Sequence, residues 1–121
     1  MLGFGLPVPK KILAVSDDEA LLRTRQMILE REGFTVAAAR GLEEATRACA
    51  DGEKFDLILL GHSIPRREKE KMLPELKKRC PAPILSIRRH TEPPVPGAEF
   101  SVDSHDGPEA MIQAVKRATK S

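Results

Sequence analysis

The sequence predicts an α/β fold with a doubly wound sheet of five parallel strands. Short apolar runs typical of buried strands alternate with amphipathic helical runs, and turn residues separate them. Strands that alternate with helices are joined by right-handed crossovers, so the strands run parallel and helices cover both faces of the sheet. Because 121 residues suit one hydrophobic core, we expect a single domain over residues 1–121.

The first half of the chain contains two strand–helix units. Residues 12–15 form a continuous apolar run and predict a first buried strand. The polar residues that follow cap a helix over 19–32, which Gly33 ends. A second strand is predicted over 34–39 and a second helix over 42–50. The residues expected to face inward are Leu21, Leu22, Met27, Ile28 and Leu29 in the first helix and Ala45, Ala48 and Cys49 in the second.

The second half contains three more strands and two more helices. Residues 56–60 are the strongest buried-strand pattern of the sequence, and they lead into a helix over 66–79 that Pro74 is expected to shorten or kink. Further strands are predicted over 83–87 and 100–103, and Gly107 opens a last helix. The inward residues are Met72, Leu73 and Leu76 in the third helix and Met111, Ile112 and Val115 in the last.

Composition excludes several functional classes. The net charge of +2 and the absence of Trp and Tyr argue against a nucleic-acid binder. No uncharged apolar run is long enough to span a membrane, and the first residues do not resemble a secretory signal. The two cysteines, Cys49 and Cys80, are not spaced as a metal pair, and we expect reduced thiols in a cytosolic protein rather than a disulfide.

Several motifs in order resemble the receiver domain of response regulators, a CheY-like fold. KKILAVSDDEALL resembles the opening strand with its acidic pair, and FDLILLGHSIP resembles the strand that carries the phosphoacceptor Asp. PAPILSIRR and GAEFSVDSHDGPEAM match the later segments. The resemblance covers residues 10–118, taken as the core of the domain, and implies the flavodoxin-like strand order 2-1-3-4-5.

The resemblance also implies a phosphorylation site that this chain has lost. Receiver chemistry uses an Asp nucleophile, carboxylates that hold Mg²⁺, and Thr/Ser and Lys groups that contact the phosphoryl oxygens. The first acidic position holds a serine, the phosphoacceptor position a glycine, the Thr/Ser position an arginine and the Lys position a serine. The resulting vestigial pocket comprises Ser16, Asp17, Gly61, Arg88 and Ser104, and the aromatic switch position becomes Ser101. The chain therefore looks like a pseudo-receiver without the phosphoacceptor Asp.

The fourth helix of the family is expected to be shortened or missing. Only nine steps separate Arg88 from Gly97, and Pro93, Pro94 and Pro96 lie between them. We therefore expect residues 89–97 to be extended or turn-rich. Because the family dimerises through the face built on this helix, we expect a monomer or a weak dimer.

Some residues allow two interpretations. Asp17 and Asp18 form either a residual cation site or a helix cap. The three histidines, His62, His90 and His105, follow predicted strands and form either a metal-binding or pH-sensing cluster with Asp17 or Asp103, or separate solvated side chains. Arg88 either leans over Gly61 to pair with Asp17 in place of Mg²⁺, or points into solvent beside Arg89.

A basic segment and the two cysteines are further candidate functional features. Residues 66–90 contain nine Lys and Arg against three Glu, a net charge of +6, which indicates either a surface for an anionic partner or a solvated helix. Cys49 is expected as a small core residue, and Cys80, which follows two basic residues, is a candidate for redox sensing.

The expected function is a stand-alone pseudo-receiver interaction module in two-component or phosphorelay signalling, with its output in trans. The alternative is a ligand-responsive domain that binds an anion or a metal at the altered strand-end pocket. We expect no enzymatic activity, because Gly61 removes the family nucleophile and no Ser-His-Asp pattern or phosphate loop replaces it. We also expect no cofactor or bound metal, a signalling protein as partner, no contact with nucleic acid or membrane, and a cytoplasmic location.

Overall fold

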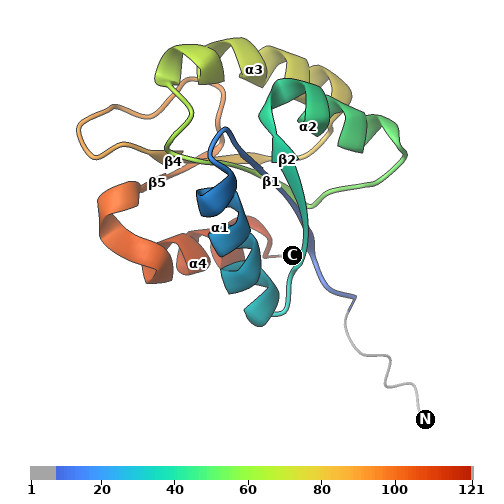
Figure 1. Cartoon of the computed structure of the whole chain (residues 1–121), viewed down its shortest axis with the longest axis horizontal. Helices are drawn as coiled ribbons and strands as arrows, with labels where there is room; N and C mark the ends of the chain where they lie inside the picture. Colours follow the sequence, from blue (N-terminus) through green and yellow to red (C-terminus); the bar gives the residue numbers. More distant parts are fainter. Residues whose placement is uncertain (1–7, 121) are drawn as a thin grey trace.

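The computed structural model describes residues 8–120, which form one five-stranded sheet with helices on both faces (Figure 1). The strands are β1 (Lys11–Ser16), β2 (Thr35–Arg40), β3 (Leu57–Leu60), β4 (Ile84–Arg88) and β5 (Phe100–Asp103). All neighbouring strands pair in parallel, in the order β2-β1-β3-β4-β5. The predicted fold class and flavodoxin-like strand order are confirmed.

Four α-helices cover this sheet in the described part of the chain. They are α1 (Glu19–Arg31), α2 (Gly41–Ala50), α3 (Arg66–Arg79) and α4 (Gly107–Ala118), and a 3-10 turn, η1 (Ser104–Asp106), precedes α4. Helices α1 and α4 lie on one face and α2 and α3 on the other (Figure 1). Within residues 8–120, no helix combines the length and the hydropathy that a membrane crossing needs. The expectation about a secretory signal concerns residues that lie mostly outside the described range.

The core consists of two apolar layers separated by the central strands. Side chains of β1 alternate between the layers, because successive strand residues point to opposite faces. Ile12 and Ala14 join the layer under α1 and α4, whereas Leu13 and Val15 join the layer under α2 and α3. All four residues of β3 are buried, as the continuous apolar run predicts for a strand covered on both faces.

The connection between β4 and β5 contains no helix, which confirms the expectation for residues 89–97. Three prolines restrict this segment, and it covers part of α3 in place of a helix. Val95 is only 4% exposed and packs into the layer under α3, and Arg66 of α3 donates to the carbonyl of Pro94 at 3.3 Å. The family's fourth helix is therefore replaced by a short, anchored loop.

The inward position expected for Met27 is wrong, and so is the shortening of α3 expected at Pro74. Met27 is 56% exposed rather than inward, because the stripe that faces the sheet runs through Leu22, Arg25 and Leu29 at helical spacing. Pro74 does not shorten α3, which continues to Arg79. Pro74 lies on the exposed side of that helix, where its ring meets solvent rather than the sheet.

The two cysteines form a disulfide, and the expectation of reduced thiols is wrong. Cys49 lies in the last turn of α2 and Cys80 follows α3, and their Cα atoms lie 5.6 Å apart. The helices α2 and α3 pack side by side on the same face of the sheet, which brings together cysteines separated by 31 positions in the sequence. Cys80 is buried and is therefore not the accessible redox-sensing thiol that its basic neighbours suggested.

Candidate functional site

The carboxyl ends of the strands meet at one edge of the sheet and bring the predicted pocket positions together. Ser16 is the last residue of β1 and is completely buried. Gly61 directly follows β3, and its N–H donates to the carbonyl of Val15 at 2.9 Å. Arg88 ends β4, and Ser104 follows β5 as the first residue of η1. In parallel sheets of this type, ligands bind at this edge.

Ser16, which the resemblance assigns to the first acidic position, belongs to a hydrogen-bond network of hydroxyl groups. The hydroxyl of Ser63 donates to Asp17 at 2.5 Å and lies 3.1 Å from the hydroxyl of Ser16. The Ser16 oxygen also accepts from the backbone N–H of Asp18 at 3.0 Å. Asp18 caps α1 by accepting from the N–H of Leu21 at 3.0 Å. The capping interpretation of Asp18 is confirmed, and Asp17 is held by a serine.

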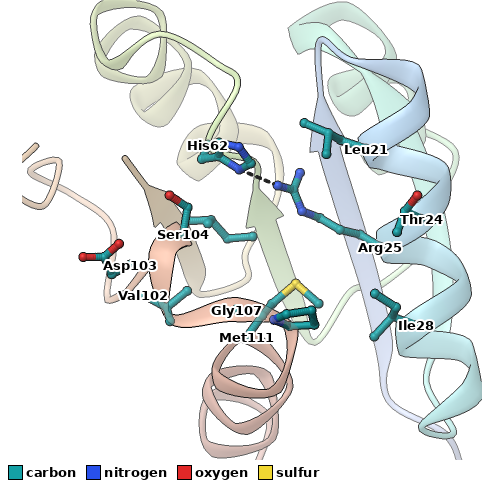
Figure 2. A pocket seen from close by; sticks show the side chains of 12 residues that line it. Leu21, Thr24, Arg25, Ile28, His62, Val102, Asp103, Ser104, Gly107 and Met111 are labelled. Carbon is teal, nitrogen blue, oxygen red and sulfur yellow. Dashed lines mark hydrogen bonds between the residues drawn. The ribbon is translucent and has the colours of Figure 1, made fainter. Parts of the chain in front are cut away.

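The space beside Gly61 is filled by the guanidinium of Arg25, which comes from α1. A Cβ atom placed on Gly61 would lie 2.5 Å from Nη1 of Arg25, closer than real Cβ contacts allow. The second terminal nitrogen, Nη2, donates to Nδ1 of His62 at 2.6 Å (Figure 2). Arg25 is only 8% exposed, and Nη1 has no hydrogen-bond partner among residues 8–120. A buried cation therefore occupies the space beside Gly61, the position to which the resemblance assigns the phosphoacceptor.

The expected pair between Arg88 and Asp17 over Gly61 does not form, because each of the two residues has other partners. Arg88 points toward β5, where its Nη1 lies 3.6 Å from the carboxylate of Asp103 and donates to the carbonyl of Glu92 at 3.2 Å. The strand register accounts for the contact between Arg88 and Asp103, because the two residues are directly opposite each other in β4 and β5. A cation does cover Gly61, but a helix on the sheet face supplies it.

Two of the three histidines gather around Asp103, and the third does not. Nδ1 of His90 lies 2.8 Å from the Asp103 carboxylate, and the rings of His90 and His105 stack with centroids 4.4 Å apart. The backbone N–H of His105 donates to Asp103, and this bond, together with His90 and Arg88, lowers the pKa of the Asp103 carboxyl. His62 instead accepts from Arg25. In the described range, no three His, Cys, Asp or Glu side chains form a metal-binding group.

A second buried cation, Lys69, reaches this edge from α3. It is 3% exposed, and its Nζ donates to the hydroxyl of Ser86 at 2.9 Å and to the carbonyl of Ile87 at 2.7 Å. Its pKa is lowered to about 8; burial is the largest cause, Glu92 opposes the shift, and the positive charges of Arg25 and Arg89 contribute to it. The ammonium of Lys69 is therefore hydrogen-bonded to the end of β4 from α3.

The positive surroundings also act on His62. Burial is the largest cause of its lowered pKa, and the charges of Arg25, Lys69 and Arg89 add to it. Arg89 approaches the same segment from the β4–β5 loop and donates to the carbonyls of His62 and Ser63 at 3.1 and 3.3 Å. Burial likewise lowers the pKa of Arg25, partly offset by Asp18. The lowered pKa favours the neutral form of His62.

A pocket of about 180 Å³ opens between α1 and the start of α4, next to Arg25 and His62 (Figure 2). Most of its walls are apolar. Its lining residues are Leu21, Thr24, Arg25, Ile28, His62, Ile87, Val102, Asp103, Ser104, Gly107, Pro108 and Met111. Of the five predicted pocket positions, only Ser104 lines this cavity. Asp17 lies instead beside a separate cavity that Gly41 and Ile64 also line.

The cations at the centre of the site, Arg25 and Lys69, were not predicted, although the sequence carries a signal for both. Arg25 lies three residues after Leu22 and four before Leu29, on the inward stripe of α1. Lys69 lies three and four residues before Met72 and Leu73 on the inward stripe of α3. A charged residue at an inward helical position has to find a buried partner or remain costly, which marks it as a candidate site residue.

The basic segment of residues 66–90 is largely a solvated helix. Among its cations, Arg66 pairs with Glu70 at 2.9 Å and Arg79 with Glu75 at 3.5 Å. Lys77 pairs with Glu99 at the start of β5, and Lys69 is buried. These pairs favour the solvated-helix interpretation over a dedicated anionic partner surface.

Solved structures with the same fold as this chain include response regulators. The chain is 35% identical over 99 residues to the alkaline phosphatase synthesis transcriptional regulatory protein PhoP of Bacillus subtilis, which covers 79% of this chain and 41% of PhoP. The N-terminal domain of a response regulator/sensory box/GGDEF 3-domain protein from Carboxydothermus hydrogenoformans superposes with a TM-score of 0.78 at 26% identity, over 92% of this chain and 94% of that one. A response regulator receiver domain protein from Clostridium thermocellum gives a TM-score of 0.76 at 20% identity, over 91% and 94% of the two chains. No family model matches the chain.

The fold is that of CheY-like receiver domains, and the chain is similar in sequence to response regulators. Its relatives are response regulators, and it is similar to them over most of its own length. The chain spans about two fifths of PhoP, because the aligned region covers 41% of that protein. Homology thus associates the chain with two-component signalling.

Proposed function

We propose that this chain is a pseudo-receiver, a protein–protein interaction module of two-component or phosphorelay signalling that works without phosphorylation on Asp. One observation carries the proposal: Gly61 stands where the nucleophile would be, and the guanidinium of Arg25 occupies the space beside it. A glycine offers no group that can accept a phosphoryl. The module would convey its state by binding a partner protein rather than by chemical modification.

The Mg²⁺ ion of receiver chemistry does not fit the residues present. Mg²⁺ needs several oxygen ligands in a nearly octahedral arrangement, usually including carboxylates. Ser16 replaces one carboxylate, and Asp17 accepts from Ser63. Two buried cations, Arg25 and Lys69, would oppose a divalent ion at this edge. We therefore derive no metal-dependent step for this chain.

The output of the module is proposed to be a signalling partner, not nucleic acid, bound by a monomer or weak dimer. The relative PhoP is named as a transcriptional regulatory protein, but the matched region is only part of it. In this chain, the short loop between β4 and β5 replaces the family's fourth helix and changes the face beside β5. A partner protein that binds this face would therefore differ from proteins that bind a receiver through the fourth helix.

The proposed module is non-enzymatic and cytoplasmic, as its response regulator relatives suggest. Disulfides are uncommon in the reducing cytosol, so the Cys49–Cys80 pair is the feature that bears most directly on location. Thiol labelling of the protein in intact host cells tests this point. Complete protection of both cysteines would favour an oxidising compartment over the cytoplasm.

Incubation with acetyl phosphate and Mg²⁺ is expected to leave the mass of the chain unchanged. Gly61 supplies no nucleophile, and Ser16 and Arg25 remove the metal site that would activate the phosphoryl donor. Intact-mass spectrometry measures the result, with a receiver domain that has the phosphoacceptor Asp as the positive control. A hydroxylamine-labile phosphoryl adduct on Asp17 or Asp18 would contradict the proposal.

The variant Gly61→Asp sharpens this test. The new carboxylate would meet the guanidinium of Arg25, whose flexible end can shift to pair with it, so we expect a folded but still unmodified protein. If Gly61→Asp alone becomes phosphorylated, the remaining site is still competent and the loss of function is confined to one residue. The triple variant Gly61→Asp/Ser16→Asp/Arg25→Ala restores the acidic pair and removes the cation, and is the variant expected to gain modification.

A further inference from the structure

The pocket between α1 and α4 has the size and the lining of a small-molecule site. Its volume is about 180 Å³, and a cavity of roughly 150 Å³ lined by apolar side chains holds a molecule as large as benzene. Ile28, Val102 and Met111 form apolar walls from α1, β5 and α4 (Figure 2). Such a cavity, with a few polar groups at one end, is the usual form of a ligand site.

The polar end of this pocket has more donors than acceptors. Arg25 lines this pocket. Its Nη1 is buried against Gly61, and its Nη2 donates one of two protons to Nδ1 of His62, which leaves the second Nη2 proton as a donor. Because Nδ1 accepts this bond, the neutral ring of His62 carries its proton on Nε2, which is a further donor. The hydroxyl of Ser104 also lines this end. A ligand with two acceptor oxygens would complement these groups.

The carboxylate of Asp103 also lines the pocket, but it does not remove the preference for a ligand with acceptor oxygens. It is already paired with Arg88 at 3.6 Å, with His90 at 2.8 Å and with the backbone N–H of His105 at 2.8 Å. Among residues 8–120, the guanidinium of Arg25 has only a neutral histidine as its hydrogen-bond partner. One buried positive charge without a hydrogen-bonded carboxylate therefore remains beside an apolar cavity, and it matches a single negative charge.

We propose that this pocket binds a small monocarboxylate with an apolar body of about the size of benzoate. The carboxylate would accept from Arg25, with His62 and Ser104 as further donors, and the apolar body would lie against Ile28, Val102 and Met111. A doubly charged phosphate fits less well, because most of the wall is apolar and only one unpaired cation lines it. The inference does not depend on the signalling role proposed above.

Isothermal titration of the 121-residue chain with sodium benzoate tests the proposal directly. We expect a Kd below about 1 mM, which is reasonable for a ligand of roughly nine heavy atoms. Benzyl alcohol has the same apolar body without the charge, and should bind at least about tenfold more weakly because it cannot pair with the guanidinium. No binding of benzoate at concentrations of about 10 mM, equal binding of benzyl alcohol, or tighter binding of inorganic phosphate would each overturn the proposal.

Variants locate the site. Arg25→Gln should weaken benzoate binding at least about tenfold, whereas Arg25→Lys keeps the charge and should retain part of the affinity. Val102→Phe keeps Arg25 but fills the cavity, and should also weaken binding. Arg23→Gln is the matched control, because Arg23 is an exposed arginine of α1 that does not line the pocket, and its affinity should equal that of the parent chain. Unchanged affinity in both Arg25→Gln and Val102→Phe, with folding verified by NMR, would place benzoate elsewhere and refute the assignment.

Discussion

Reduction of the disulfide between Cys49 and Cys80 is expected to lower the free energy of unfolding by about 3–4 kcal/mol. The bond joins residues 31 positions apart, and closing a loop of this length in the unfolded chain removes conformational entropy of that order. A domain of this size is stable by only about 5–15 kcal/mol, so the loss is a large share of the total. Urea denaturation with and without a reductant measures the difference.

A matched variant separates the crosslink from other effects of the reductant. The double variant Cys49→Ala/Cys80→Ala should unfold with the lower stability of the reduced chain, and a reductant should then have no further effect. An unfolding midpoint that is the same in oxidised and reduced protein would contradict a stabilising crosslink. Because Cys80 is buried, a small additional loss from the removed sulfur is expected in the variant.

The pH dependence of stability is expected to reveal the buried Lys69. Burial lowers its pKa to about 8 in the folded protein, against the ordinary value of 10.5. Between these values the unfolded chain still holds the proton that the folded protein has released. The free energy of unfolding therefore rises with pH across this window, by up to about 3 kcal/mol in total.

Comparison with Lys69→Met isolates this contribution, since the other titrating groups are shared. The parent chain should gain about 2 kcal/mol relative to Lys69→Met between pH 7.5 and 9.5, measured by urea denaturation at each pH. Lys71→Met is the control, because Lys71 lies on the same helix with an exposed side chain, and it should leave the pH profile of the parent unchanged. Parallel profiles for the parent and Lys69→Met would mean that Lys69 keeps its ordinary pKa.

Two buried cations lie at the carboxyl edge of the sheet. A receiver site gathers carboxylates around a metal ion, whereas this edge holds Arg25 beside Gly61 and Lys69 at the end of β4. Burying a cation costs free energy unless hydrogen bonds or an opposite charge stabilise it. Lys69 is satisfied by Ser86 and Ile87, but Arg25 retains a buried nitrogen without a partner in the described part of the chain. Arg25 also lines the pocket between α1 and α4, whereas Lys69 does not, and this is why we propose a ligand for Arg25.

The sequence by itself determined the fold and most element boundaries. The apolar runs of β1 and β3 and the helical stripes of α3 and α4 are local patterns, and local patterns are sufficient to identify strands and helices. The three prolines after β4 determined that no helix forms there, because proline lacks the N–H that a helix needs. The position of Gly61 directly after β3 was also predicted from the sequence, since it depends only on where a strand ends.

Only the tertiary structure decided which side chains meet. Cys49 and Cys80 pair because α2 and α3 pack on the same face, and no pattern near either cysteine records that distance. Arg88 turns to Asp103 because register places the two opposite each other, which leaves the space at Gly61 to Arg25. Long side chains such as Arg and Lys reach across elements, so their partners depend on the packing of the whole domain rather than on neighbours in the sequence.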